Sequence, residues 1–281
     1  MRKAADLMRA GMHALGEPIP ARLLIVRALD TVFDFLGYET KIALRSVPRP
    51  QYGFGLLHAA RLARRLGIPR ISALEFGVAG GNGLLALEAH ATRVTRETGV
   101  EVEIHGFDSG AGLPPAVDYR DLPYAWEPGF YAMDEEKLKA RLTSASLIIG
   151  DVRETTSRFA DRNPAPIGFI AFDLDYYSST VGAFHILELD DRFLLPRVFC
   201  YFDDVAGGPN FCYNEFTGEL LAIAEFNAAH DHRKVARIAG LRHNFGSVPA
   251  RWHEQMYVAH LFTHPHYNVP SHRGEDFLGL R

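Results

Sequence analysis

Apolar segments of strand length alternate with helical patterns along most of the chain after residue 70. The strand segments are short and mostly apolar, which is typical of buried strands. We predict strands at 71–76, 100–107, 147–149, 167–172, 198–202, 235–239 and 255–262. Helical patterns lie between or after them, at 84–94, 134–142, 154–162, 178–189 and 214–230. This alternation predicts an α/β fold with a seven-stranded, mostly parallel sheet flanked by helices.

The first 68 residues carry helical patterns and no clear strand. Residues 21–36 place apolar side chains over a broad face, and residues 53–66 repeat the pattern. The second segment ends at Gly67, before Pro69, which is a common way for a helix to stop. We therefore predict a helical N-terminal arm or lid at 1–68 and a main domain at 69–281.

A glycine-rich turn follows the first predicted strand, with glycines at 77, 80, 81 and 83. Strand, turn and helix form the first half of a nucleotide-binding βαβ unit, because glycine lets backbone N–H groups close on a ligand. The spacing is G-x-x-G-G-x-G, whereas nicotinamide cofactors favour G-x-G-x-x-G. Glu75 precedes the first glycine by two residues, and its carboxylate suits a cofactor with an ammonium or sulfonium group. The alternative is a turn that binds no ligand.

Carboxylates follow four successive predicted strands. In open α/β sheets, ligands bind outside these strand ends. A single acid there can be a helix N-cap, which is the simpler interpretation of Asp108 and Asp151. Helix caps do not need paired acids, whereas a hard divalent cation does. The remaining acids at these ends are paired: Asp173 with Asp175, and Asp203 with Asp204.

Composition restricts the classes of partner. The chain has 281 residues and a net charge of −4, which argues against a general nucleic-acid binder, because phosphate recognition needs a basic surface. No run approaches the length of a membrane span, and charged residues interrupt residues 4–16 where a secretory core would lie. The two cysteines, Cys200 and Cys212, lack metal-type spacing. We expect a cytoplasmic protein that binds neither nucleic acid nor membrane.

Ordered blocks between residues 74 and 204 resemble the class I S-adenosylmethionine-dependent methyltransferases, and within them the macrocin O-methyltransferase-like family. The blocks are E-F-G-V at 75–78 with Gly81, F-D-S at 107–109 with G-L-P at 112–114, Trp126 with Gly129 and Tyr131, G-D-V at 150–152 with E-T at 154–155, and D-x-D-x-Y-S-S-T at 173–180 with Asp203-Asp204. The last block is the most specific. The sequence departs from the family at Ala79-Gly80, where a bulky aromatic residue and an arginine are often found.

The resemblance implies a Rossmann-like fold with S-adenosyl-L-methionine and Mg²⁺ as cofactors. It implies ribose recognition by Asp108, adenine recognition near Asp151, and a magnesium site. The metal ligands that it implies are Asp173, Asp203 and Asp204, and Asp173 is also the candidate catalytic base, with a histidine as the alternative. The implied cofactor contacts are Glu75, Gly77, Val78, Gly81, Asp108, Ser109, Asp151 and Asp173.

The sequence therefore predicts a magnesium-dependent O-methyltransferase that acts on a hydroxyl of a sugar, glycoside or other natural-product-like small molecule. One alternative is a catalytically degenerate protein of the same fold that only binds ligands. The other is a nicotinamide-dependent oxidoreductase, which the glycine spacing disfavours. Because the apolar faces of the arm exceed what one sheet edge can bury, we expect it to cover the acceptor side and to contribute to a homo-oligomer interface.

Overall fold

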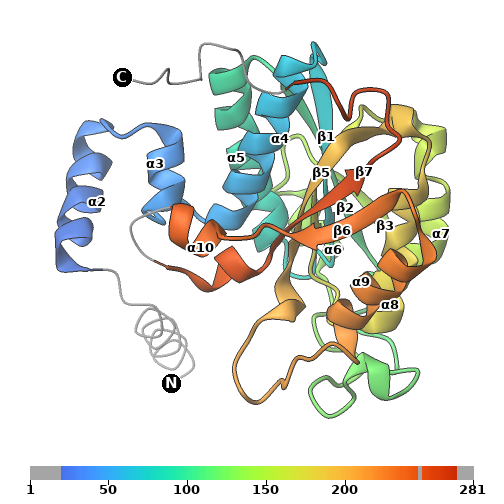
Figure 1. Cartoon of the computed structure of the whole chain (residues 1–281). Coiled ribbons are helices and arrows are strands. Elements are labelled where there is room, and N and C mark those ends of the chain that lie inside the picture. The colour runs from blue at the N-terminus through green and yellow to red at the C-terminus, as the bar shows by residue number, and fades with distance from the viewer. Residues whose placement is uncertain (1–19, 246–248, 271–281) are drawn as a thin grey trace, which may run out of the picture.

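A seven-stranded sheet forms the centre of the computed structural model, which describes residues 20–245 and 249–270 (Figure 1). The strand order is β3-β2-β1-β4-β5-β7-β6, and β7 runs antiparallel to both of its neighbours. The strands are β1 (Arg70–Phe76), β2 (Glu101–Asp108), β3 (Ser146–Ile149), β4 (Ile167–Phe172), β5 (Leu194–Phe202), β6 (Arg233–Arg237) and β7 (Met256–Leu261). The predicted α/β architecture with a mostly parallel, Rossmann-like sheet is confirmed.

Helices cover both faces of the sheet (Figure 1). Alternate residues of a strand point to opposite faces, so Ala73 packs into one hydrophobic core and Leu74 into the other. The first core includes α4 (Pro50–Arg65) and α5 (Asn82–Thr98). The second includes α8 (Tyr177–Phe184) and α9 (Gly218–Ala229), and α7 (Val152–Ser157) packs beside α8.

The helix α4 packs tightly against the centre of the sheet. A Cβ atom added at Gly55 would lie 2.4 Å from the ring of Phe169 on β4, so only glycine allows this approach. Leu56, Leu57 and Ala60 of the same helix are buried in the first core. This part of the predicted N-terminal arm therefore shares its hydrophobic core with the sheet.

The helices before α4 lie at the periphery. They are α2 (Ala21–Phe33) and α3 (Tyr38–Ala43), and α2 lies beyond α3 as seen from the sheet (Figure 1). The apolar side chains Leu24, Ile25, Leu29, Val32 and Phe33 of α2 are exposed. The division of the chain at residue 68 stays a prediction, and residues 1–19 of the arm lie outside the described residues. No helix in the described ranges is both long and apolar enough to cross a membrane.

Several element boundaries differ from those predicted. The helices expected at 134–142 and 154–162 are shorter, as α6 (Glu135–Lys139) and α7, and a separate 3-10 turn covers Phe159–Arg162. The strand β5 begins four residues before its predicted start and contains Pro196. Its register with β4 shifts across this segment, which fits a proline because proline has no N–H for the ladder.

Candidate active site

The ends of β1 and β4 approach each other closely at Gly77. This residue has a φ of 83°, and an added Cβ would lie 1.7 Å from the carbonyl oxygen of Asp173. The backbone N–H of Gly77 donates to the carbonyl of Phe107 at 2.9 Å, and that of Asp173 donates to the carbonyl of Phe76 at 3.0 Å. The glycine turn is thereby joined to the ends of both β2 and β4.

A cavity of about 950 Å³ opens at these strand ends. It extends from the ends of β2 and β3, across the glycine turn, to the ends of β4 and β5. Six aspartates and two arginines are among its lining residues, so acidic groups outnumber basic ones. The structure brings most of the predicted site residues to this cavity, namely Gly77, Val78, Asp108, Ser109, Asp151, Asp173, Asp203 and Asp204.

The carboxylate of Asp108 ties the glycine turn to the end of β2. One oxygen accepts a hydrogen bond from the backbone N–H of Ala79 at 2.8 Å, and the other accepts from that of Gly110 at 2.7 Å. A carboxylate oxygen has two lone pairs, so each oxygen can accept one more hydrogen bond. The next residue, Ser109, lines the cavity, and its hydroxyl donates to the carbonyl of Gly112 at 3.0 Å.

Asp151 is the N-cap of α7 and also lines the cavity. One oxygen of its side chain accepts from the backbone N–H of Arg153 at 2.8 Å, as the capping interpretation predicted. Its position at the end of β3 places it at the opposite end of the cavity from the residues that follow β5.

Glu75 and Gly81 are predicted cofactor residues that lie outside the cavity lining. The carboxyl of Glu75 is buried and accepts a hydrogen bond from the hydroxyl of Tyr52 at 2.7 Å. A Cβ at Gly83 would lie 1.7 Å from a Glu75 oxygen, so the glycine turn passes directly over this carboxyl. Burial raises the pKa of Glu75 to about 7, although Arg49 and the Tyr52 hydrogen bond act in the opposite direction. Gly81 is buried and is the N-cap of α5.

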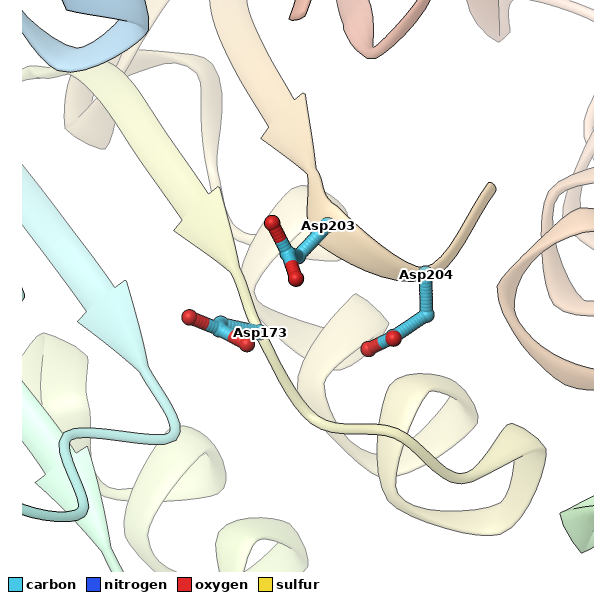
Figure 2. A group of neighbouring side chains, drawn as sticks. All are labelled: Asp173, Asp203 and Asp204. Carbon is cyan, nitrogen blue, oxygen red and sulfur yellow. The ribbon is translucent and has the colours of Figure 1, made fainter. Parts of the chain in front are cut away.

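Three carboxylates meet where β4 and β5 end side by side (Figure 2). Asp173 follows β4, and Asp203 and Asp204 follow β5. One oxygen from each lies within 4.8 Å of the others. A magnesium ion about 2.1 Å from each ligand would separate opposite ligands by about 4.2 Å. Adjacent ligands would lie about 3.0 Å apart, and three ligands include at least two adjacent pairs, so the three oxygens would have to move together by up to about 1 Å each to share an ion.

Neighbouring groups hold these carboxylates in place. The hydroxyl of Tyr201 donates to Asp203, and the hydroxyl of Tyr213 donates to Asp204 Oδ1 at 2.6 Å. Asp204 Oδ2 accepts from the backbone N–H of Asp175 at 3.0 Å. Such hydrogen bonds commonly orient metal ligands in proteins.

The electrostatics of the cluster favour a cation. Burial, and then the charges of Asp203 and Asp204, raise the pKa of Asp173 well above its usual value. Burial, Asp175 and Asp203 do the same to the pKa of Asp204. Burial and Asp173 raise the pKa of Asp175 to about 8. Like charges gathered this closely raise the pKa of one another, and a divalent ion would offset the repulsion.

Aromatic side chains from two loops form one wall of the cavity. The loops are 109–131 and 206–217. The rings of Trp126 and Phe211 stack with centroids 5.2 Å apart, and Phe211 stacks on Tyr213 at 5.4 Å. The hydroxyl of Tyr124 donates to the carbonyl of Phe211 at 2.8 Å, so a hydrogen bond and ring stacking join the two loops. Trp126, Phe211 and Tyr213 all line the cavity.

Several solved structures that resemble this chain are methyltransferases by name. The calicheamicin methyltransferase CalS11 is 22% identical over 88% of this chain and 94% of its own, with a TM-score of 0.49. The O-methyltransferase NovP is 14% identical over 75% of this chain and 79% of its own, also at 0.49. The O-methyltransferase TomG from Streptomyces achromogenes, in complex with SAM, is 15% identical over 90% and 94%, at 0.43. No protein-family model and no curated protein matches the sequence. The assignment of the fold rests on the strand order described above.

Some cavity residues carry no sequence signal that would identify them. Arg49 lies just before α4, and its guanidinium reaches Asp173 across 124 positions of sequence. Phe211 and Tyr213 lie in a loop after β5 whose path the sequence does not reveal. The glycines and the proline at 207–209 mark this segment as a loop, and the aromatic residues that follow are the only hint of a binding surface.

Proposed function

We propose that this protein is an S-adenosylmethionine-dependent O-methyltransferase that uses a divalent metal. The observation that carries the proposal is a single cavity in which the glycine turn and Asp108 face the same space as the cluster of Asp173, Asp203 and Asp204. A methyl donor on the glycine turn and an acceptor hydroxyl at the cluster would then lie next to each other. Methyl transfer depends mainly on such placement, because in-line geometry supplies much of the rate.

The donor's adenosine is assigned to the ends of β2 and β3. The free lone pairs of the Asp108 carboxylate would accept the ribose hydroxyls, and Ser109 and Asp151 line the adjacent space. Gly77 and Val78 of the turn would contact the rest of the donor.

The three carboxylates fit a magnesium ion in number and in donor type, and one oxygen from each lies within 4.8 Å of the others. When bound, the ion lowers the pKa of an acceptor hydroxyl. The residues Tyr201 and Tyr213 keep Asp203 and Asp204 in position for it. Of the three carboxylate residues, Asp173 is the one whose backbone contacts Gly77 of the glycine turn, and we assign its side chain to accept the proton that leaves the acceptor hydroxyl.

The acceptor is assigned to the aromatic wall, and we propose a sugar, a glycoside or a similar small molecule. Aromatic rings pack well against ring faces of such compounds. The indole N–H of Trp126 is buried and has no hydrogen-bond partner among the described residues, so it is available to an acceptor oxygen. We further propose a cytoplasmic homo-oligomer. The exposed, unpaired Cys212 suits a reducing compartment, and the exposed apolar face of α2 suits a subunit interface.

Calorimetry and a labelled methyl-transfer assay test this function together. We expect S-adenosylhomocysteine, but not NAD, to bind, and methyl transfer to sugars, glycosides or phenols to require Mg²⁺. Asp204→Asn should stop transfer and spare donor binding, whereas Asp190→Asn, at an exposed surface carboxylate, should change neither. Binding of NAD alone would favour an oxidoreductase. Turnover that persists in excess chelator would show that the carboxylate cluster is structural.

A further inference from the structure

The backbone of Arg49 adopts a conformation that side-chain-bearing residues rarely use. Arg49 is the N-cap of α4, with a φ of 42° and a ψ of 64°, and Pro50 follows it at the first helical position. Such left-handed backbone is unfavourable outside glycine and persists only where the surroundings enforce it, most often at functional sites.

A buried histidine enforces this conformation. The Nε2 atom of His90 on α5 lies 2.8 Å from the carbonyl oxygen of Pro48 and 3.2 Å from that of Arg49. Carbonyl oxygens only accept, so Nε2 carries the proton, and Nδ1 then accepts from the hydroxyl of Tyr38 at 2.6 Å. His90 is 3% exposed, and burial lowers its pKa, so the ring is neutral and both nitrogens are satisfied.

This arrangement places the guanidinium of Arg49 at the cavity, where one third of the side chain is exposed. Its Nη1 donates to the hydroxyl of Tyr52 at 3.1 Å and lies 3.5 Å from Asp173 Oδ2. The Asp173 contact is long for a charge-assisted hydrogen bond, which is usually 2.7–2.9 Å. The guanidinium is therefore positioned at the cavity, and its neighbours leave N–H groups that can donate to a ligand.

The strand order fixes what part of the donor reaches this position. The cavity runs from Asp151 after β3 and Asp108 after β2, past the glycine turn after β1, to Asp173 after β4. With adenosine at the β2 and β3 ends and the acceptor at the β5 end, the amino-acid part of the donor must lie near β1 and β4. The carboxylate of an α-amino acid needs a cationic partner, and Arg49 lines this part of the cavity, beside Asp173.

We propose that Arg49 binds the α-carboxylate of the methionine moiety of the donor. The assignment rests on the proposed function and adds to it a residue that fixes one end of the donor. Arg49 acts as a fork of several N–H donors, which matches a carboxylate better than a point charge does. On donor binding, the guanidinium exchanges its long contact with Asp173 for the ligand carboxylate.

Two ligands that differ only in the carboxylate test the assignment. S-adenosylhomocysteine carries it, and S-adenosyl-3-thiopropylamine is the same molecule without it. By calorimetry, the wild-type protein is expected to bind the second ligand about 10- to 100-fold more weakly. Arg49→Gln should weaken S-adenosylhomocysteine binding by a similar factor. It should change binding of the thiopropylamine by less than about threefold, because removing the ligand carboxylate and removing the Arg49 guanidinium abolish the same interaction.

Two further variants distinguish the effect of the Arg49 charge from the effect of its guanidinium geometry and from unspecific effects of removing an arginine. Arg49→Lys should give an intermediate loss for S-adenosylhomocysteine, because a cation remains but the fork is lost. Arg192→Gln removes an arginine that is 74% exposed, and should leave both affinities unchanged. The comparison of the two ligands on the wild-type protein holds even if an Arg49 variant fails to fold.

Three outcomes would overturn the assignment. Equal binding of the two ligands by the wild-type protein would show that the carboxylate has no charged partner. An equal loss for both ligands in Arg49→Gln would show that Arg49 only shapes the site, and an unchanged affinity would leave it as a partner of Asp173 alone. Failure of the wild-type protein to bind S-adenosylhomocysteine at all would instead refute the proposed function, and the role of Arg49 with it.

Discussion

The buried carboxyl of Glu75 predicts a loss of stability with rising pH that Glu75→Gln should remove. Its pKa in the folded protein is about 7, against an ordinary value of 4.5. The folded state therefore binds the proton more tightly than the unfolded state, so the free energy of unfolding falls as pH rises from about 4.5 through 7. This difference in pKa between about 7 and 4.5 corresponds to about 3.4 kcal/mol in the free energy of unfolding, of which about 2.5 kcal/mol is lost between pH 5 and pH 8.

Urea unfolding of both proteins in excess chelator, at pH 5 and at pH 8, measures this effect. Glutamine keeps an oxygen that can accept the hydrogen bond from the Tyr52 hydroxyl but does not ionise. The difference between the two proteins therefore reports the ionisation of the Glu75 carboxyl. The stability of the wild type minus that of Glu75→Gln should be about 2.5 kcal/mol lower at pH 8 than at pH 5. Glu101→Gln, at the exposed start of β2, is the control for removing a carboxylate. A difference between wild type and Glu75→Gln that is the same at both pH values would refute the argument.

Three further substitutions test other parts of the structure. Asp108→Ala should weaken S-adenosylhomocysteine binding by about 1–3 kcal/mol in calorimetry, through loss of charged hydrogen bonds, and an unchanged affinity in a folded variant would remove Asp108 from the donor site. Gly77→Ala should lower the free energy of unfolding by more than about 2 kcal/mol, because the added Cβ would lie 1.7 Å from a backbone oxygen at a positive φ, and a wild-type denaturation midpoint would contradict this. Val32→Asp combined with Phe33→Asp, at side chains 73% and 69% exposed on α2, should reduce the molar mass measured by light scattering, and an unchanged mass would exclude this face from a subunit interface.

The sequence predicts best where one physical signal decides the structure. The strand β4 matches its predicted bounds, because a continuous apolar run of six residues is buried on both faces and ends just before Asp173. The cluster of Asp173, Asp203 and Asp204 follows from topology, because adjacent parallel strands end at one edge of the sheet. Its convergence could therefore be predicted without any knowledge of side-chain positions.

Prediction from sequence fails where a position depends on contacts between distant segments. The position of Arg49 depends on His90, 41 positions later, which contacts its backbone carbonyl. The surroundings of Glu75 depend on Tyr52 and on the path of the glycine turn above it. Its spacing from Gly77 indicates that it is near a ligand site but does not reveal that it is buried behind the turn. Its contact with a cofactor stays a prediction.

If the aromatic wall binds the acceptor, as we propose, the pairing of the loops 109–131 and 206–217 has a consequence for how acceptor preference changes during evolution. Trp126 stacks on Phe211, and the hydroxyl of Tyr124 donates to the carbonyl of Phe211. A substitution at any of these residues therefore removes a contact that both loops share. Selection for a new acceptor must therefore act on both segments together, although about 75 residues separate them in the chain. Chimeras with related enzymes should keep a well-ordered acceptor site only when both loops come from the same parent.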